Sequence, residues 1–536
     1  MVIPKWLCNA IFWSICFESV LIRQCLAYSK MDIYSGDAWP DISPQRQNAI
    51  RSQRDVMRNI TIDQIPYVGV NLRKVLFNQQ SVDLITNMGP VYSPSGASGN
   101  ETDALIDNFT SLLNSGLQSM VLDLEIRNNT WMIVETDLNF QQYLTTLNSF
   151  LVQSHYDLSA NIQVLLLNII TKKNATIDKL VYSNPQLNLT NIIDTYLGSE
   201  YIFTPEAFLN DQDSSLAITK RPKWPTVQQF LFERHKRIII TELTSSLNLS
   251  ETPYIFPRDV LHYDENNSTL SCPTNNTEID FMKSISWRFL NAPFTVDEIK
   301  QYITCGLSPI ISNYYDISNV TDIVKLISPS IVWAWEENEP RLSNSKLVVG
   351  KDSIQAYNCA KVKYISANSS LSWSVGNCYN KKVGLCKKSE SESENNWLVT
   401  NTEDSFFDFN DLQEEACPEG YRFAMPPTPL DGLSLAQYLD KSIYSASEDT
   451  EIWINLNSIM VSNCWVIGEN ATCPYRKEVS TRNFLQMVSP VSIMSLFLLV
   501  GVFYFSLLTI PIHDNRKNWR KIVNQVSKNE FEGVPS

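Results

Sequence analysis

Acidic side chains near the ends of apolar segments are the residues of this chain that could do acid–base chemistry. Asp123 and Glu125 lie two residues apart in MVLDLE (120–125), and Glu242 follows RIIIT (237–241). Alternate residues of a strand point to the same face, so Asp123 and Glu125 would be presented together. Positioned carboxylates can donate and accept a proton during hydrolysis. These three residues are the catalytic candidates of the sequence.

Histidine, which often shares such proton transfers, is scarce. The strand pattern around these acids resembles barrels of the phospholipase C and glycerophosphodiester phosphodiesterase type, which need paired histidines. One histidine is expected at the end of the first strand, but that segment reads YVGVNLRK. The four histidines of the chain lie elsewhere, at His155, His235, His262 and His513. The pattern therefore departs from such enzymes at a position that their chemistry requires.

Two interpretations of the acids stay open. In the first, Asp123 and Glu125 form a salt bridge with Arg127 or are solvated, and the chain is a non-catalytic binding or scaffold protein. In the alternative, Asp123, Glu125 or Glu242 serves a lumenal hydrolase of the phosphodiesterase or glycosidase type. The sequence contains no Gly-x-Ser-x-Gly, His-Glu-x-x-His or Cys-x-x-Cys motif. We therefore prefer the first interpretation and predict no cofactor and no metal site.

Short apolar segments alternate with longer amphipathic ones over the part of the chain that must position these acids. The expected strands are residues 67–72, 120–125, 162–168, 237–241 and 307–312. Nearly continuous apolar runs with branched side chains are typical of a parallel sheet buried on both faces. The intervals leave room for crossover helices such as residues 140–151. We expect an α/β domain over residues 28–318, a partial TIM barrel with its acids at the carboxyl ends of strands.

A disulfide-rich α+β region is expected after residue 318. Residues 319–390 resemble the second half of a C-type lectin-like domain, on the motif residues Trp333, Trp335, Glu339-Pro340, Cys359, Trp373, Cys378 and Cys386. The calcium-binding positions depart, because Arg341 replaces the motif's Asn and Ser374-Val375 replace Asn-Asp, which leaves too few oxygen ligands. Residues 391–482, with CPEGYRF and EIWINLNS, resemble a first half more faintly. We describe them as a membrane-proximal cysteine-containing module.

Eight cysteines follow residue 27, and an even number in an oxidising compartment predicts disulfides. They are Cys272, Cys305, Cys359, Cys378, Cys386, Cys417, Cys464 and Cys473. Eight cysteines allow about 105 pairings, so the sequence does not assign the partners. Cys464 and Cys473 are close enough along the chain to pair in a hairpin.

The two ends of the chain predict a type I, single-pass membrane protein. Residues 1–27 have the basic start, apolar run and small final residues of a cleaved signal peptide. Residues 488–510 carry no charge and are long enough to cross a bilayer as a transmembrane helix. Residues 511–536 form a basic tail, which fits a cytosolic location. We expect the endomembrane system, with the region before the span in the lumen of the endoplasmic reticulum, the nuclear envelope or a later secretory compartment.

Asn-x-Ser/Thr sequons occur only before the expected span, and they predict a glycoprotein. They are Asn59, Asn100, Asn108, Asn128, Asn174, Asn188, Asn248, Asn266, Asn267, Asn275, Asn319, Asn368 and Asn470. The formal net charge of the whole chain is -14. Because the tail is basic, the negative charge lies in the lumenal part, which argues against direct nucleic-acid binding there. We expect a glycan or protein ligand in the lumen, and an anionic lipid or a cytosolic protein at the tail.

The sequence is similar to one known family over essentially its whole length. RSQRDVMRNITIDQIPYVGVNLRKVL (51–76) and the tail PIHDNRKNWRKIVNQVSKNEFEGVPS (511–536) closely resemble the fungal family called maintenance of telomere capping protein 6. CGLSPIISN, VGNCYNKKVGLC and IWINLNSI also resemble that family. The resemblance implies a type I membrane glycoprotein of a budding yeast with a genetic link to telomere capping. It transfers no catalytic residue.

Overall fold

The computed structural model of the chain consists of two compact units, Met1–Cys473 and Pro474–Ser536. The described residues are 43–77, 101–154, 160–170, 184, 186–214, 224–244, 252–265, 270–313, 323, 326–327, 330–341, 356–366, 369–388, 397–410, 416–441, 450–468, 473, 481–509 and 515–530. The expected signal peptide, residues 1–27, lies outside them.

Eight parallel strands of the first unit form a curled, open barrel. They are β1 (Gly69–Asn71), β2 (Ser119–Arg127), β4 (Gln163–Ile169), β5 (Ile238–Glu242), β6 (Ile255–Phe256), β7 (His262–Glu265), β8 (Arg288–Ala292) and β9 (Ser308–Ile311). Their order is β6-β5-β4-β2-β1-β9-β8-β7, and β3 (Thr130–Ile133) pairs antiparallel with the end of β2. Because β6 and β7 stand at the two ends of this order, the described barrel is open between them.

Helices connect most of these strands. They are α3 (Leu72–Val75), α5 (Glu101–Asn114), α6 (Phe140–Gln153), α8 (Leu189–Tyr196), α9 (Pro205–Ser214), the π-helix η2 (Gln228–Glu233), α10 (Asn276–Lys283) and α11 (Val296–Thr304). Side chains define where the helices begin. Asn139 and Gln142 form a reciprocal capping box at the start of α6, and Thr295 and Glu298 form another at α11. Such caps satisfy amide groups that a helix start leaves unpaired.

The two faces of the barrel sheet meet different surroundings. Met120 of β2 contacts the hydroxyl of Tyr143 on α6, and Tyr143 stacks on Phe109 of α5 with ring centroids 4.6 Å apart. Even-numbered positions of β2 therefore face the helices. Val121 and Asp123 alternate with them and face the barrel interior. Since registered partners of parallel strands share a face, the interior residues of every strand can be assigned from the pairing.

This architecture confirms the partial TIM barrel that the sequence predicts. All five expected strands are present, as β1, β2, β4, β5 and β9, and the expected helix at residues 140–151 is α6. The sequence did not identify β6, β7 and β8. The segments HYDE and RFLNA carry too few apolar residues to read as buried strands, and β6 has only two residues.

A second sheet of six strands follows in the same unit. Its strands are β10 (Cys359–Ile365), β11 (Ser370–Gly376), β12 (Val383–Lys388), β13 (Trp397–Val399), β14 (Tyr421–Phe423) and β15 (Thr450–Asn457). Their order is β11-β10-β15-β12-β13, and β14 pairs with β12. The short helix α13 (Phe406–Asn410) and the longer α14 (Pro429–Asp440) lie between these strands in sequence. Strands from both sides of the expected boundary at residue 390 thus share one sheet.

Four disulfides confirm the predicted use of the eight cysteines. The pairs are Cys272–Cys305, Cys359–Cys378, Cys386–Cys417 and Cys464–Cys473. The last is the hairpin pair that the spacing predicts. The first joins the segment before α10 to the end of α11, so it belongs to the barrel.

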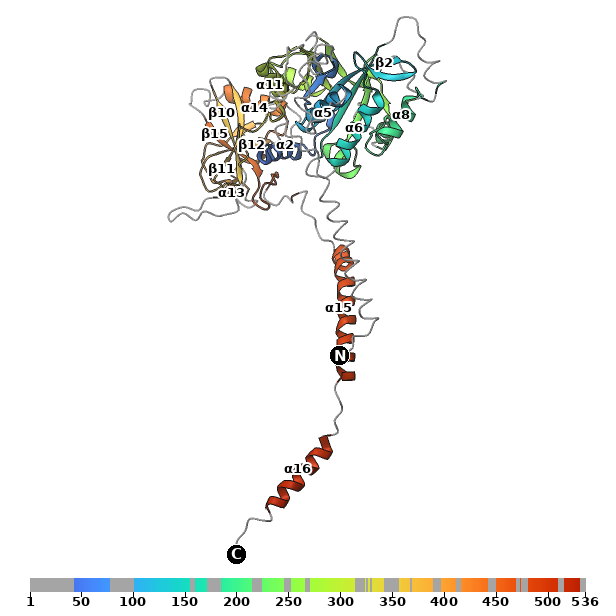
Figure 1. Cartoon of the computed structure of the whole chain (residues 1–536). Coiled ribbons are helices and arrows are strands. Elements are labelled where there is room, and N and C mark those ends of the chain that lie inside the picture. The colour runs from blue at the N-terminus through green and yellow to red at the C-terminus, as the bar shows by residue number, and fades with distance from the viewer. Residues whose placement is uncertain are drawn as a thin grey trace. The chain divides into compact units, whose positions relative to one another are not determined.

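Helix α2 (Pro44–Val56) lies between the barrel and the second sheet (Figure 1). On the barrel side, Arg54 donates to the carbonyl of Ala160, which precedes β4. On the other side, the Arg51 guanidinium donates to the carbonyl of Asn463 at 2.9 Å, and Ser52 accepts the indole N–H of Trp335 at 2.9 Å. Helix α2 therefore joins two regions that are distant in the sequence.

An ion pair between the exposed Lys283 and the buried Asp431 also joins the barrel to helix α14 beside the second sheet. Asp431, near the start of α14, accepts from Lys283 of α10 at 2.9 Å and from the Thr428 hydroxyl at 2.6 Å. Burial alone would raise the pKa of Asp431, but Lys283, the Thr428 hydroxyl and the charge of Lys387 together lower it below its ordinary value of 3.8. A carboxylate with a lowered folded-state pKa stabilises the fold above its unfolded-state pKa, and this stability is lost as the pH falls through the folded value.

We expect Asp431→Asn to lower the free energy of unfolding by about 2 kcal/mol near neutral pH, because a charge-assisted bond to Lys283 is lost. The difference from the wild type should shrink as the pH falls below the unfolded-state pKa of about 3.9 and through the lowered pKa of folded Asp431. Thermal unfolding of both chains across this pH range measures the effect. The exposed Asp259 provides the control as Asp259→Asn. A pH-independent difference would contradict the ion-pair explanation.

The described residues of the second unit form two helices, α15 (Thr481–Thr509) and α16 (Asn515–Glu530). α15 covers all but the last residue of the span expected at 488–510. Among the residues that the structure describes, no helix meets the length and apolarity required for crossing a membrane.

Candidate functional site

Asp123 lies at the carboxyl end of β2 and is held by two neighbours. Its Oδ1 accepts from the side-chain amide of Asn168 at 2.8 Å, and its Oδ2 pairs with Arg73 at 3.2 Å. Asn168 is the registered partner of Asp123 on β4, and Arg73 comes from α3 directly after β1. Arg73 also pairs with Glu135 at 2.6 Å. Both carboxylate oxygens of the buried Asp123 are therefore engaged, and one of them is neutralised by a guanidinium.

Three further polar side chains face the same end of the barrel interior. Asn71 ends β1 and caps α3 by accepting from the Lys74 amide at 3.2 Å. Tyr263 of β7 and Asn291 of β8 occupy interior positions by register. Burial, and then the charges of Glu265 and Asp123, raise the pKa of Tyr263, whereas the Asn291 side chain lowers it. We call Asn71, Arg73, Asp123, Asn168, Tyr263 and Asn291 the barrel mouth.

Glu125, the second acid of the expected pair, belongs to a different environment. It lies beyond the part of β2 that pairs with β4, and its registered partner is on β3. Its carboxylate bonds Arg127 at 3.1 Å, and Arg127 also contacts Asp137 at 3.4 Å and the carbonyl of Thr136 at 2.9 Å. The salt bridge to Arg127 considered from the sequence is thus present.

Glu242 is separated from Asp123 by the sheet itself. It pairs with Leu167 of β4, whereas Asp123 pairs with the next residue, Asn168. Successive residues point to opposite faces, so Glu242 points toward the helical layer and Asp123 into the barrel. Glu242 is completely buried, and its Oε1 accepts from the Thr244 hydroxyl at 3.4 Å. The structure does not bring the three acidic candidates together.

The barrel mouth is suited to hydrogen bonding more than to proton transfer. It offers amides, a phenol and an arginine-paired carboxylate, and the Oδ1 of Asn291 has no hydrogen-bond partner within the described chain. Within that same part of the chain, no three His, Cys, Asp or Glu side chains form a set that could hold a metal ion. His235 is exposed and His262 begins β7 at the opposite end, while His155 and His513 lie outside the described residues.

Of the barrel mouth, sequence reasoning identified only Asp123 and missed the other five residues, Asn71, Arg73, Asn168, Tyr263 and Asn291. Asn168 and Asn291 carried a usable signal, because each follows apolar residues near the end of a strand. Arg73 carried none, since a cation just after a strand is common on surfaces. Its role depends on the neighbouring β2 strand, which lies about 50 residues further along the chain.

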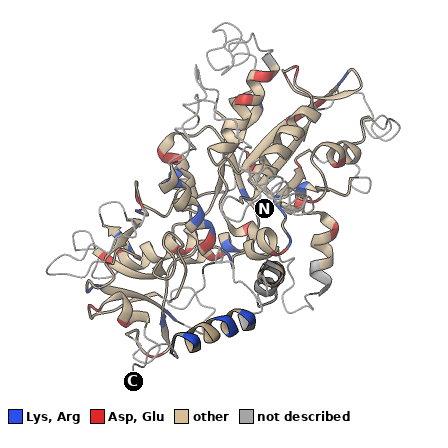
Figure 2. Cartoon of the chain, turned by 60° about the horizontal axis from the view of Figure 1, so that its bottom comes forward, with Lys and Arg blue, Asp and Glu red and all other residues tan. Residues whose placement is uncertain are grey.

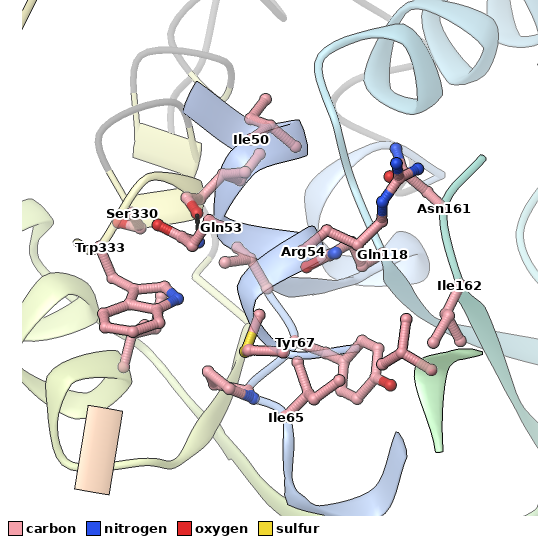
Figure 3. Close-up of a pocket in the computed structure, with 16 residues that line it drawn as sticks. Ile50, Gln53, Arg54, Ile65, Tyr67, Gln118, Asn161, Ile162, Ser330 and Trp333 are labelled. Carbon is pink, nitrogen blue, oxygen red and sulfur yellow. Dashed lines mark hydrogen bonds between the residues drawn. The ribbon is translucent and has the colours of Figure 1, made fainter. Parts of the chain in front are cut away.

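The opposite end of the barrel is closed by α2 and by residues 330–333, with a small cavity between them (Figure 3). The cavity has a volume of about 40 Å³ and is lined by Gln53, Arg54, Tyr67, Gln118 and Trp333 among others. The Gln53 side chain donates to the Ile331 carbonyl at 3.0 Å and accepts from the Ala334 amide at 3.1 Å. Such a volume holds a few water molecules but no substrate.

The tryptophans of the lectin-like motif pack against one another at β11, which is an edge strand of the second sheet. Trp373 of β11 packs edge-on against Trp333 and Trp335, each with centroids 5.7 Å away. Arg341, which stands where the motif has Asn, bonds the Glu339 carboxylate at 2.9 Å. The acid that would serve as an oxygen ligand is therefore paired with a guanidinium.

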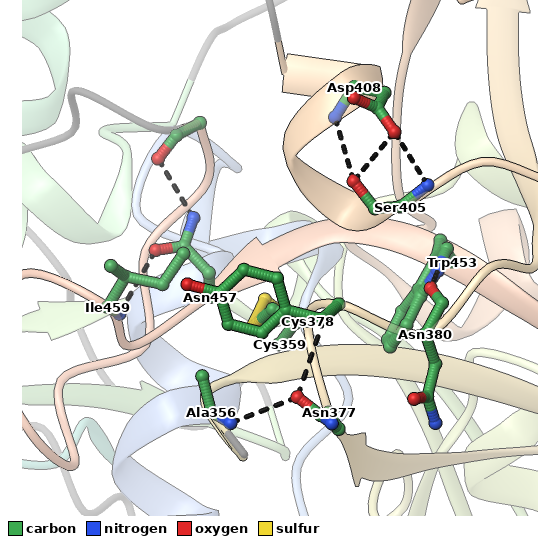
Figure 4. The surroundings of a disulfide bond; sticks show 12 residues. Ala356, Cys359, Asn377, Cys378, Asn380, Ser405, Asp408, Trp453, Asn457 and Ile459 are labelled. Atoms are coloured by element: carbon green, nitrogen blue, oxygen red, sulfur yellow. Dashed lines mark hydrogen bonds between the residues drawn. A yellow bond between two sulfur atoms is a disulfide. The ribbon is translucent and has the colours of Figure 1, made fainter. Parts of the chain in front are cut away.

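The disulfide Cys359–Cys378 links β10 to the residues after β11 (Figure 4). Beside it, Asn377 accepts from the Ala356 amide at 2.9 Å, and Trp453 of β15 donates to the Asn380 carbonyl at 3.2 Å. These contacts make the region around the disulfide a packed core. Trp453 is completely buried and serves the fold.

Comparisons with known proteins place the chain in one family. A family model described as the MTC6 partial TIM-barrel domain matches residues 40–333. Maintenance of telomere capping protein 6 of Saccharomyces cerevisiae is 43% identical over 512 residues, covering 94% of this chain and 93% of that protein. The protein of the same name from Zygosaccharomyces rouxii is 38% identical over 521 residues, covering 96% and 97%.

Among solved structures, the crystal structure of S. officinalis PLC21 matches with a TM-score of 0.27 and 9% identity, covering 65% of this chain and 47% of that one. These matches cover 94% and 96% of the chain, so they include the barrel and the second sheet. This chain therefore belongs to the maintenance of telomere capping protein 6 family.

Proposed function

We propose that the chain is a type I membrane glycoprotein that acts as a non-catalytic binding or scaffold protein of the endomembrane system. The observation that carries this proposal is the barrel mouth. A carboxylate that works as a general acid or base must exchange its proton freely with a reacting group. Asp123 instead has both oxygens engaged, one of them by Arg73, and it is 4% exposed.

The proposed binding role is supported by how the second region is built. We infer that it is a C-type-lectin-like unit whose halves occur in exchanged order, with the segment that resembles the second half before the segment that resembles the first. β15, from the later segment, pairs with β10 and β12 from the earlier one. The disulfide Cys386–Cys417 joins the two segments. The ion pair between Arg341 and Glu339 favours a ligand that is bound without calcium.

The proposed topology is supported by the distribution of sequons and charges. Five sequon asparagines are described, Asn59, Asn108, Asn128, Asn188 and Asn275, and none of them is buried. The other eight lie outside the described residues: Asn100, Asn174, Asn248, Asn266, Asn267, Asn319, Asn368 and Asn470. α15 exposes large apolar side chains such as Phe497, Leu498 and Leu499. We propose that residues 488–510 span the membrane, with 1–27 as the signal peptide and 511–536 as the cytosolic tail.

The proposed link to telomere capping is indirect. The relatives are named for maintenance of telomere capping, and we extend that role to this chain. In the proposed topology only the tail could face the cytosol or, at the inner nuclear envelope, the nucleoplasm. The lumenal region would then influence capping through its binding partners in the endomembrane system. No direct contact with nucleic acid is required.

One experiment tests the function and the topology together. In a yeast strain that depends on the chain for telomere capping, we expect Asp123→Asn and Glu242→Gln to support capping like the wild type, because neither acid performs chemistry. Asp137→Asn, at a side chain that is 84% exposed, is the matched control. A C-terminal tag on each variant should be removed by protease on intact microsomes, while a glycosidase shifts the mass of the protected remainder.

The alternative is a lumenal hydrolase, and the gathering of polar groups at the carboxyl end of the barrel favours it. It predicts loss of capping in Asp123→Asn or Glu242→Gln with unchanged thermal stability and glycosylation. It also predicts hydrolysis of phosphodiester or glycoside test substrates by the purified full-length chain. Either result would contradict a non-catalytic role. A chain that a glycosidase does not shift would contradict the topology but not the non-catalytic role.

A further inference from the structure

Helix α16 has one continuous apolar stripe. Trp519, Ile522, Val523 and Val526 recur at spacings of three, one and three residues. At about 100° per residue these four side chains lie within roughly one third of the helix circumference. They are 65%, 50%, 58% and 53% exposed, respectively, although each is large and apolar. A helix whose apolar side is this exposed requires a surface that covers it.

The remainder of α16 is basic. Lys517, Arg520, Lys521 and Lys528 are all exposed, and their positions lie outside the apolar stripe. Figure 2 shows basic positions recurring along this helix. The described side chains of the helix, residues 517–528, include no acid. An apolar stripe flanked by lysine and arginine is the pattern of helices that lie in a membrane interface, with the apolar side toward the acyl chains. Trp519 is the residue type that favours this depth.

The position of α16 in the chain indicates which surface can cover its apolar stripe. Only residues 510–514 separate it from α15, and this length spans at most about 20 Å. If α15 crosses a bilayer, as proposed above, the start of α16 lies within that distance of the membrane surface. The charge of the helix complements anionic phospholipid headgroups, which are enriched on the cytosolic side.

We propose that α16 lies on an anionic phospholipid surface, with Trp519, Ile522, Val523 and Val526 inserted and the basic residues at the headgroups. The proposal rests on the membrane topology proposed above, and it assigns the tail to lipid binding. The tail is thereby held flat on the membrane rather than extended toward a soluble partner. Each lysine or arginine near such a surface should favour the bound state about fivefold.

The test uses the full-length chain in nanodiscs of phosphatidylcholine alone or mixed with phosphatidylserine. A polarity-sensitive dye is attached to Val526→Cys on the apolar stripe or, as the matched control, to Asn524→Cys on the polar side. The eight cysteines after the expected signal peptide are all in disulfides, so the new thiol is the one labelled. Dye attachment at other sites is measured on the chain without the new cysteine.

We expect a blue shift at position 526 in nanodiscs with phosphatidylserine, little shift at position 524, and a decrease of the effect at high salt. Lys517→Gln combined with Lys521→Gln should reduce the bound-to-free ratio roughly 25-fold. Equal spectra at both positions, or the same shift without phosphatidylserine, would overturn the proposal. So would a shift seen only in microsomes, which would indicate a protein partner. Extraction of the chain by carbonate would contradict the proposed membrane span but not the lipid contact of α16, since the dye reports on α16 separately.

Discussion

Replacing Arg288 by Met is expected to lower the free energy of unfolding of the first unit by about 3–5 kcal/mol. Arg288 begins β8 and is 2% exposed. Its guanidinium donates to the Gly306 carbonyl at 2.8 Å, to both the side chain and the carbonyl of Gln64, and to the carbonyls of Met282 and Ile285 at 2.9 Å. Methionine fills a similar volume but replaces none of these hydrogen bonds.

The large effect follows from how much of the barrel meets at this one side chain. Gln64 precedes β1, Met282 lies in α10, and Gly306 follows α11. Burial lowers the pKa of Arg288 to about 10, so the side chain stays charged at neutral pH. Thermal unfolding of the full-length chain, monitored by tryptophan fluorescence, should show a decrease of roughly 10 °C. Arg258→Met, at an exposed position of the same domain, should leave the midpoint unchanged. Equal midpoints for the two variants would show that the network does not stabilise the barrel.

Removal of the disulfide Cys386–Cys417 by Cys386→Ala and Cys417→Ala is the second change with a large expected effect. The bond closes a loop of sequence separation 31. In the loop-entropy account, loss of the bond lowers the stability of the second sheet by about 3.5 kcal/mol. Both cysteines are buried, and the bond ties β12 to the segment that returns as β14 and β15. Loss of the bond should therefore free the strand that lies between β10 and β12.

Limited proteolysis under native conditions measures this second effect, with cleavage expected first between residues 417 and 457. The matched control is removal of Cys464–Cys473, whose loop has a sequence separation of 9. The same account gives about 2.5 kcal/mol for that loop. The control bond lies after β15 and does not connect strands of the sheet. If the two double variants were cleaved at the same rate and sites, the second sheet would not depend on the bond that joins its two segments.

The partial barrel was predictable because five of its strands can be recognised from their own local sequence. Residues such as Leu165, Leu166 and Leu167 are buried on both faces, so the strands appear as continuous apolar runs. β7 and β8 were missed for the opposite reason. β8 begins with Arg288 and contains Asn291, and each of these polar residues is explained only by partners from other parts of the chain. A pattern read along one segment cannot reveal such partners.

The candidate site was predicted in location but not in composition. Asp123 does lie at the carboxyl end of a barrel strand, as its sequence context indicated. Its relation to Glu242 depends on the register between β2, β4 and β5, which places them on opposite faces. A shift of one residue in that register would have brought them to the same face. The sequence contains no local feature that determines this register.

The pairing of the four disulfides has a consequence for biosynthesis. The eight cysteines after the expected signal peptide pair in chain order, the first with the second, the third with the fourth, and so on. A polypeptide emerges from the ribosome with its N-terminus first, so each bond can close before the following pair of thiols appears. At most one thiol then awaits its partner at any moment. Vectorial synthesis thereby favours this pairing among the about 105 that eight cysteines allow.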